Sequence, residues 1–186
     1  MKKFALILLL GFVLATGAFA ESNHPGGWGV GGGFQFGGAW RNSDIHSGLA
    51  LFLKAPQLPI YWGINLNIFD WEFATDKSYF GLSVTGDYYY FDRPLYAPIN
   101  LGWYAGGGAY FGFYSGSTKT PKHSHTTIDL GVRIPIGLSW QPLDFLEVFL
   151  DIAPSVGFYM TLNDPGKNKM GLGGGWQGDL GVRFWL

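Results

Sequence analysis

The sequence contains no cysteine and few charged residues. Without thiols the chain forms neither a disulfide framework nor a thiolate metal site, and it has no cysteine that could carry the lipid of a lipoprotein. Charged residues make up 13% of the chain, against roughly 25% in a typical soluble domain. With 12 basic and 13 acidic residues, the chain also lacks the basic surface that nucleic-acid binding requires, so we expect no nucleic-acid partner.

Long apolar runs are absent except at the N-terminus. There, two lysines precede the apolar segment 4–15, and an Ala-Phe-Ala sequence ends at Ala20. This layout predicts a cleaved secretory signal peptide over 1–20 and one domain over 21–186. No later run approaches the ~18 apolar residues of a membrane helix. Because only helices and closed sheets satisfy their backbone polar groups in hydrocarbon, a membrane-bound mature chain has to be a β-barrel.

Glycine and aromatic residues are abundant, and they alternate with a period of two. In segment 28–40 the even positions hold most of the large apolar residues, whereas the odd positions hold glycine, glutamine and alanine. Such alternation is typical of a β-strand with two different faces. Seven further strands are predicted near 47–54, 60–69, 79–91, 99–114, 126–140, 146–162 and 172–186. The predicted fold class is all-β, an eight-stranded antiparallel up-and-down transmembrane β-barrel.

The predicted connections between these strands are of two kinds. Three contain proline and are mostly short, near 55–59, 92–98 and 141–145. Four are polar, near 41–46, 70–78, 115–125 and 163–171. In outer-membrane barrels the short turns are periplasmic and the longer loops external. We therefore expect an outer-membrane location in a diderm bacterium, with both termini periplasmic and the polar loops available to host or surface ligands.

The side chains of the two strand faces indicate which face meets lipid. The polar face is mostly Gly, Ala, Ser, Asn and Tyr, which suits the narrow lumen of an eight-stranded barrel. A soluble, lipocalin-like barrel is the disfavoured alternative, because it would bury the apolar face and expose long charged side chains. The apolar face is expected to contact outer-membrane lipids. The interfacial aromatic girdle is predicted to contain Trp28, Trp40, Trp62, Trp103, Trp140 and Trp176.

A repeated Asp-Leu-Gly-Val-Arg sequence occurs at 129–133 and 179–183. Residues four apart in a strand share a face, so both the acid and the arginine of each copy should point into the lumen. Buried charges without partners are costly, so the inward charges should form a network. Its predicted members are Asp87, Asp129, Arg133, Glu147, Asp151, Asp179 and Arg183, with Lys54 as a further candidate.

Strand pairing through the tight turns predicts that Asp151 lies opposite Arg183 and diagonal to Arg133. A network that fills and rigidifies the lumen is the favoured interpretation, and a gated polar path is the alternative. Pro135 and Pro154 fall inside two predicted strands, where proline cannot donate to the ladder. We expect a local bulge where these two prolines meet.

No catalytic, cofactor or metal motif is complete in this sequence. The glycine runs do not complete a nucleotide-binding loop. His123 and His125 lack the further ligands of a metal site. Asp44, His46 and Ser47 are the components of an acyl-transfer set, but they match no motif of the lipid A palmitoyltransferase or deacylase barrels. We expect no cofactor and no enzymatic activity, and a lipid-modifying enzyme is the disfavoured alternative.

After residue 20 the chain resembles the small eight-stranded outer-membrane proteins, namely the OmpA transmembrane domain, OmpX and OmpW. The shared features are the signal, strand number, girdle, charged lumen and terminal strand. Segment 181–186 resembles the signal read by the barrel-insertion machinery, although Leu186 replaces the usual terminal phenylalanine. The resemblance implies a non-enzymatic barrel that displays short surface loops, in envelope integrity, adhesion or host interaction. OmpW-like function would instead imply a narrow, porin-like conduit for small or hydrophobic solutes.

Overall fold

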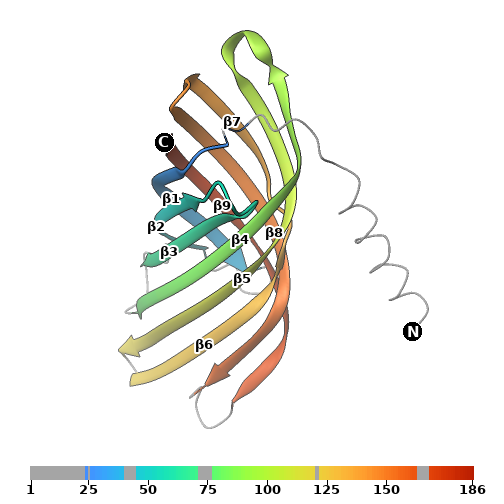
Figure 1. Cartoon of the computed structure of the whole chain (residues 1–186). Coiled ribbons are helices and arrows are strands. Elements are labelled where there is room, and N and C mark those ends of the chain that lie inside the picture. The colour runs from blue at the N-terminus through green and yellow to red at the C-terminus, as the bar shows by residue number, and fades with distance from the viewer. Residues whose placement is uncertain (1–23, 25, 40–44, 71–76, 120–121, 163–167) are drawn as a thin grey trace, which may run out of the picture.

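The computed structural model describes residues 24, 26–39, 45–70, 77–119, 122–162 and 168–186, so the predicted signal segment lies outside the described residues. Within them, nine strand segments form one antiparallel sheet that closes into a ring (Figure 1). The strands are β1 Gly29–Ala39, β2 Ile45–Lys54, β3 Tyr61–Asp70, β4 Lys77–Tyr96, β5 Leu101–Lys119, β6 Lys122–Arg133, β7 Ile136–Leu143, β8 Leu146–Leu162 and β9 Lys169–Trp185. A 3-10 helix, η1 Ala97–Ile99, joins β4 to β5. No helix in this part of the chain is long and apolar enough to cross a membrane.

The ring contains eight strands, because β6 and β7 are two parts of one. Both segments pair with β5 on one side and with β8 on the other. The first and last strands close the barrel, from Gly29 opposite Trp185 to Ala39 opposite Gly175. The predicted eight-stranded antiparallel up-and-down barrel is therefore confirmed. The turn side is the end of the barrel at which β1 begins and β9 ends, and the loop side is the opposite end. The turn side is at the top of Figure 1.

The break between β6 and β7 is not the predicted bulge. The register with β8 is the same before and after the break, so no extra residue is inserted. The Ile134 N–H donates to the Pro154 carbonyl at 3.0 Å, and the Gly106 N–H donates to the Pro135 carbonyl at 2.9 Å. The expectation of a bulge is wrong because each proline keeps its carbonyl in the ladder and lacks only the N–H.

A bulge does occur in β4, at Tyr90. The register with β5 shifts between Tyr89 and Phe91, which leaves Tyr90 as an extra residue. Because side chains alternate between faces, one extra residue reverses the faces of the residues that follow. Tyr89 and the buried Asp92 consequently both point into the lumen, although one number is odd and the other even.

Two predicted connections are largely strand. The sequence predicts a turn over 92–98, but β4 continues to Tyr96 and η1 completes the reversal. Asn100 ends η1 with φ 54°, a left-handed conformation that asparagine tolerates. The sequence also predicts a loop over 115–125, but β5 extends to residue 119 and β6 begins at residue 122. Threonine, which occurs in this segment, is among the residues enriched in strands.

The outer surface of the barrel is apolar and the inner surface is polar or aromatic. On β8, Leu150, Ile152 and Val156 are about half exposed, whereas Asp151 and Ala153 between them are buried. The lumen also holds a small apolar cluster formed by Ala50, Phe52, Tyr104 and Phe149. The apolar face of the strands therefore points outward and the polar face points into the lumen, as the alternation of residue types predicts.

Candidate functional site

The middle of the lumen is organised around Arg133, which is 1% exposed. Its Nε atom lies 3.3 Å from Asp87 Oδ1, and its Nη2 atom lies 3.2 Å from Asp179 Oδ2 and 3.6 Å from Asp151 Oδ1. The Nη1 atom donates to Gln177 Oε1 at 2.8 Å. One guanidinium on β6 thus connects β4, β8 and β9 across the barrel. We call these five residues the Arg133 cluster.

A row of neutral polar groups continues from this cluster to the opposite wall. The Gln35 amide donates to Asp179 Oδ1 at 3.2 Å, and the Ser83 hydroxyl donates to Gln35 Oε1 at 3.4 Å. The Asn65 amide in turn donates to the Ser83 hydroxyl oxygen at 3.4 Å. These contacts add β1 and β3 and reach β4 a second time, so side chains cross the whole lumen.

Three stacked tyrosines fill the space on the turn side of the Arg133 cluster. The ring centroids of Tyr61 and Tyr89 are 4.1 Å apart, and those of Tyr89 and Tyr104 are 4.3 Å apart. The Tyr104 hydroxyl donates to Asp151 Oδ2 at 3.0 Å. The stack therefore joins the Arg133 cluster to a second group of charges nearer the turn side.

Arg183 is the cation of this second group, and its partner is Glu147. The two residues are opposite each other in the β8–β9 pair, with Arg183 Nη1 2.8 Å from Glu147 Oε2. The guanidinium also lies over the rings of Phe149 and Tyr61, at 4.5 and 5.0 Å from their centroids. Such cation–π contacts stabilise a desolvated cation.

The prediction that Asp151 lies opposite Arg183 is wrong. Asp151 faces Asp179 in the β8–β9 register, and its cation is Arg133. Six residues, 163–168, separate β8 from β9 in the sequence, and a connection of this length does not determine the register.

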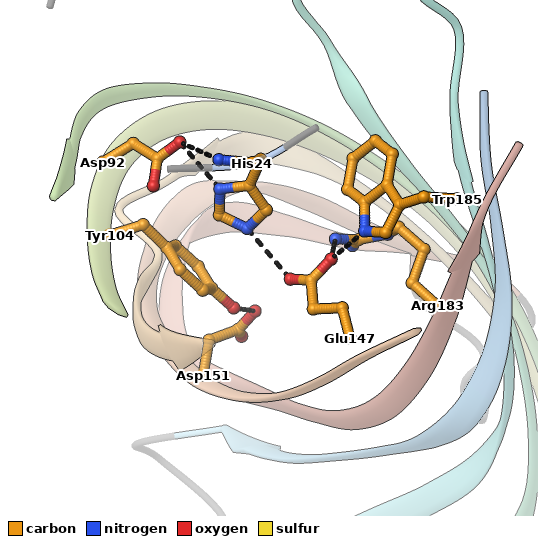
Figure 2. Close-up of polar contacts among 7 residues, drawn as sticks. All are labelled: His24, Asp92, Tyr104, Glu147, Asp151, Arg183 and Trp185. Atoms are coloured by element: carbon orange, nitrogen blue, oxygen red, sulfur yellow. Dashed lines mark hydrogen bonds and ion pairs between the residues drawn. The ribbon is translucent and has the colours of Figure 1, made fainter. Parts of the chain in front are cut away.

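His24 completes the turn-side group from outside the strands. It is 5% exposed, and its imidazole bridges two carboxylates (Figure 2). The Nδ1 atom lies 2.7 Å from Asp92 Oδ2, and the Nε2 atom lies 2.9 Å from Glu147 Oε1. The backbone N–H of His24 also donates to Asp92 Oδ2, at 3.2 Å. Trp185 Nε1 donates to the second oxygen of Glu147 at 2.9 Å.

The environment of His24 favours the charged imidazolium. Burial by itself would lower the pKa of His24. The negative charge of Glu147, hydrogen bonds to Asp92 and Glu147, and the charge of Asp92 act in the opposite direction and raise the pKa to about 9. At neutral pH both ring nitrogens therefore carry protons and both donate.

The remaining predicted network residues lie elsewhere. Asp129 is nearer the loop side, opposite Tyr159 in the β6–β8 pair. Arg133, the arginine of the same repeated sequence, is paired with other carboxylates. Lys54 points its ammonium at the carbonyl oxygens of Ala55 and Leu58, at 2.8 and 2.7 Å, and so stabilises the turn after β2.

The sequence interpretation missed His24 and Asp92. His24 lies outside every strand pattern, and no motif surrounds it. Asp92 falls in a predicted turn, and only the bulge at Tyr90 directs it inward. Uninterrupted alternation from Ser83 and Asp87 would place Asp92 on the outer face, so the period of two carried no signal for its inward direction.

The predicted girdle residues are distributed unevenly. Trp28, Trp62, Trp103 and Trp140 are near the turn-side ends of their strands and point outward. Trp176 is opposite Gly38, near the loop-side end of β1. Trp40 lies outside the described residues, as do the side chains of the proposed acyl-transfer and metal histidines His46, His123 and His125. In the described part of the chain, no cluster of three or more metal-ligating side chains is present.

Two solved structures are similar to this chain in overall shape. Neisserial surface protein A (NspA) has 15% sequence identity and a TM-score of 0.48, over 87% of this chain and 98% of its own. A major outer membrane protein from Thermus thermophilus has 14% identity and a TM-score of 0.47, over 85% of this chain and 99% of its own. No curated protein sequence matches the chain. The family model described as "Protein of unknown function (DUF3996)" matches residues 44–184, so the chain belongs to this family.

Proposed function

We propose that this protein is a non-enzymatic integral outer-membrane barrel with a closed lumen. In this proposal it acts as a scaffold that presents its loop-side connections at the cell surface, in envelope integrity, adhesion or host interaction. Segment 1–20 would direct export, and the C-terminal segment 181–186 would be recognised by the barrel-insertion machinery. The surrounding partners would be outer-membrane lipids.

The exposed apolar surface supports the membrane location. Large apolar side chains on the outer face are roughly half exposed on every side of the ring, for example Phe34 at 55%, Phe111 at 49% and Ile152 at 50%. A water-soluble protein rarely exposes so large a continuous apolar area. The buried carboxylates and arginines, in contrast, all face the lumen. Lipid is the solvent that matches this distribution.

The observation that supports a closed lumen most strongly is the burial of Arg133 among three carboxylates. An ion path through the lumen would have to separate these groups, and a buried charge that loses its partners is destabilised by several kcal/mol. The Tyr61–Tyr89–Tyr104 stack and the Arg183–Glu147 pair obstruct the lumen a second time, nearer the turn side.

Single-channel conductance in planar bilayers tests the closed lumen. We expect refolded wild-type protein to be silent and the Arg133→Ala, Arg183→Ala double variant to conduct. Arg93→Ala is the matched control, because Arg93 is exposed near the turn-side end of β4. It belongs to neither the Arg133 cluster nor the Arg183–Glu147 pair. Far-UV circular dichroism verifies that each variant retains its strands. Steady conductance of the wild type would contradict the proposal.

A conduit of the kind implied by the OmpW resemblance is the second candidate function. The observation in its favour is the break between β6 and β7, where Pro135 and Pro154 each leave a ladder position without an N–H donor. A wall weakened there could open sideways for small or hydrophobic solutes. Wild-type conductance, or solute uptake that is lost on Pro135→Ala, Pro154→Ala substitution, would favour this candidate.

A further inference from the structure

We infer that the turn-side end of the lumen is a binding site for a protonated ring of imidazole size, and that the chain's own His24 is its tethered ligand. The inference goes beyond the proposed function and holds whether or not the barrel conducts. We call the pocket around the ring, formed by Tyr61, Tyr89, Asp92, Tyr104, Glu147 and Trp185, the His24 site.

Aromatic side chains form the walls of this site. The His24 ring centroid lies 5.5 Å from that of Tyr61, 5.7 Å from that of Tyr104 and 6.0 Å from that of Trp185. A fourth ring, Tyr89, is at 5.9 Å. These distances are typical of aromatic packing, and within ~6 Å an aromatic ring also attracts a cation. The walls therefore come from four strands of the barrel, β3, β4, β5 and β9.

Two carboxylates at opposite edges of the ring select the protonation state. Asp92 contacts Nδ1 and Glu147 contacts Nε2, each within 2.9 Å. A neutral imidazole has one N–H and one lone pair, so it can donate to only one of these groups. A protonated ring donates to both, and hydrogen bonds between ions are about twice as strong as neutral ones.

The charge balance of the site also favours a cation. Asp92 and Glu147 contribute two negative charges, and Arg183 on β9 supplies one positive charge at Glu147. Lys54 on β2 is nearby, but its ammonium is directed at the turn carbonyls. Among these described groups the imidazolium supplies the second positive charge, and a soluble cation of the same size can take its place.

The tether allows the ring to leave without disturbing the barrel. Trp28 is held to the last residue of the chain by two backbone hydrogen bonds, from Trp28 N to Leu186 O at 3.1 Å and from Leu186 N to Trp28 O at 2.7 Å. Pro25, Gly26 and Gly27 lie between this anchor and His24 in the sequence. Glycine is conformationally permissive, so the segment can swing away while β1 stays paired with β2 and β9.

Chemical complementation tests the inference. In the refolded His24→Gly variant, isothermal titration calorimetry with imidazole at mildly acidic pH should show binding, because free imidazole is then largely protonated. Pyrazole has nearly the same size, but it stays neutral and its two nitrogens are adjacent, so it cannot donate to both carboxylates. It should bind at least ~10-fold more weakly, as expected for the loss of one charge-assisted hydrogen bond. Wild-type protein should bind neither compound, since its site is filled.

Matched variants locate the binding. Adding Glu147→Gln to His24→Gly should abolish imidazole binding, whereas adding Asp144→Asn should leave it intact, because Asp144 is an exposed carboxylate in the adjacent turn. Equal affinity for pyrazole, equal binding by the wild type, or no binding by a His24→Gly protein with a wild-type circular dichroism spectrum would each overturn the inference.

A measurement on the native protein covers the case in which His24→Gly does not refold. Nitrogen NMR of histidine-labelled wild type should show one ring that remains doubly protonated at neutral pH, and the His24→Gln variant should assign it. A neutral His24 ring at neutral pH would overturn the inference without any binding experiment.

Discussion

Arg183 and Glu147 are directly opposite each other on β9 and β8, and Arg183 Nη1 lies 2.8 Å from Glu147 Oε2. Glu147 is 0% exposed and uses its other oxygen for His24. One carboxylate therefore joins the last strand of the barrel to the segment that precedes the first. Glu147 is thus the anion that Arg183 and His24 share at the turn-side end of the lumen.

Replacing Glu147 by Gln should destabilise the folded barrel. The amide has nearly the same shape, but it leaves Arg183 and His24 buried without their shared anion, which corresponds to a loss of about 3–5 kcal/mol. The free energy of unfolding, measured by urea titration in lipid vesicles, checks this. Asp144→Asn is the control and should change it by less than about 0.5 kcal/mol. Equal unfolding midpoints for the two variants would contradict the assigned role of Glu147.

His24 should make stability depend on pH in the alkaline range. Its folded-state pKa of about 9 is above the ordinary value of 6.5. The folded state therefore binds the proton more tightly, and this stabilisation is complete below pH 6.5 and lost as the pH rises through 9. Among the described residues, the groups that face the ring include Asp92 and Tyr89 on β4, Glu147 on β8, Tyr61 on β3, Tyr104 on β5 and Trp185 on β9. Arg183 lies beyond Glu147.

Unfolding titrations of the wild type and His24→Gln between neutral and alkaline pH measure this contribution. The difference in free energy of unfolding between the two proteins should shrink as the pH rises. A difference that stays constant or grows would show that His24 is neutral in the folded protein.

Arg133 should not be replaceable by another cation. Lysine presents one compact ammonium, whereas the Arg133 guanidinium reaches Asp87, Asp179 and Gln177 in different directions. We expect Arg133→Lys to lower the free energy of unfolding by roughly 1–3 kcal/mol and Arg133→Met by about 3–5 kcal/mol, since the latter leaves the carboxylates without a cation. Thermal unfolding should rank the proteins wild type, lysine, methionine. A methionine variant as stable as the wild type would refute the ranking.

Gly33 should tolerate alanine less well than its neighbour Gly32. A Cβ atom at Gly33 would overlap the Leu180 carbonyl of β9, whereas at Gly32 the nearest atom is the Ala50 carbonyl oxygen at 3.6 Å, an ordinary contact. Gly33→Ala should therefore force β1 and β9 apart where the barrel closes, with a loss of about 1–3 kcal/mol. Folding yields and urea midpoints of the two alanine variants provide the comparison. Similar values for both would show that β1 and β9 are farther apart than described.

The local alternation of residue types was sufficient to predict the eight strands and the direction of most side chains. A period of two depends only on the backbone of each strand, so the inward direction of Asp87, Arg133 and Asp151 could be predicted from the sequence. The same holds for the outward direction of Trp62 and Trp140. The need to pair buried charges also predicted a network in the lumen, although not its partners.

Only the tertiary structure determined which charges meet. The β8–β9 register is established across residues 163–168 and around the closed ring, so counting along the chain placed Asp151, in place of Glu147, opposite Arg183. The extra residue Tyr90 turns Asp92 inward, and a bulge depends on pairing with β5 rather than on composition. His24 belongs to no strand, and only a closed barrel assembles the rings and carboxylates that bind it from five strands distant in sequence.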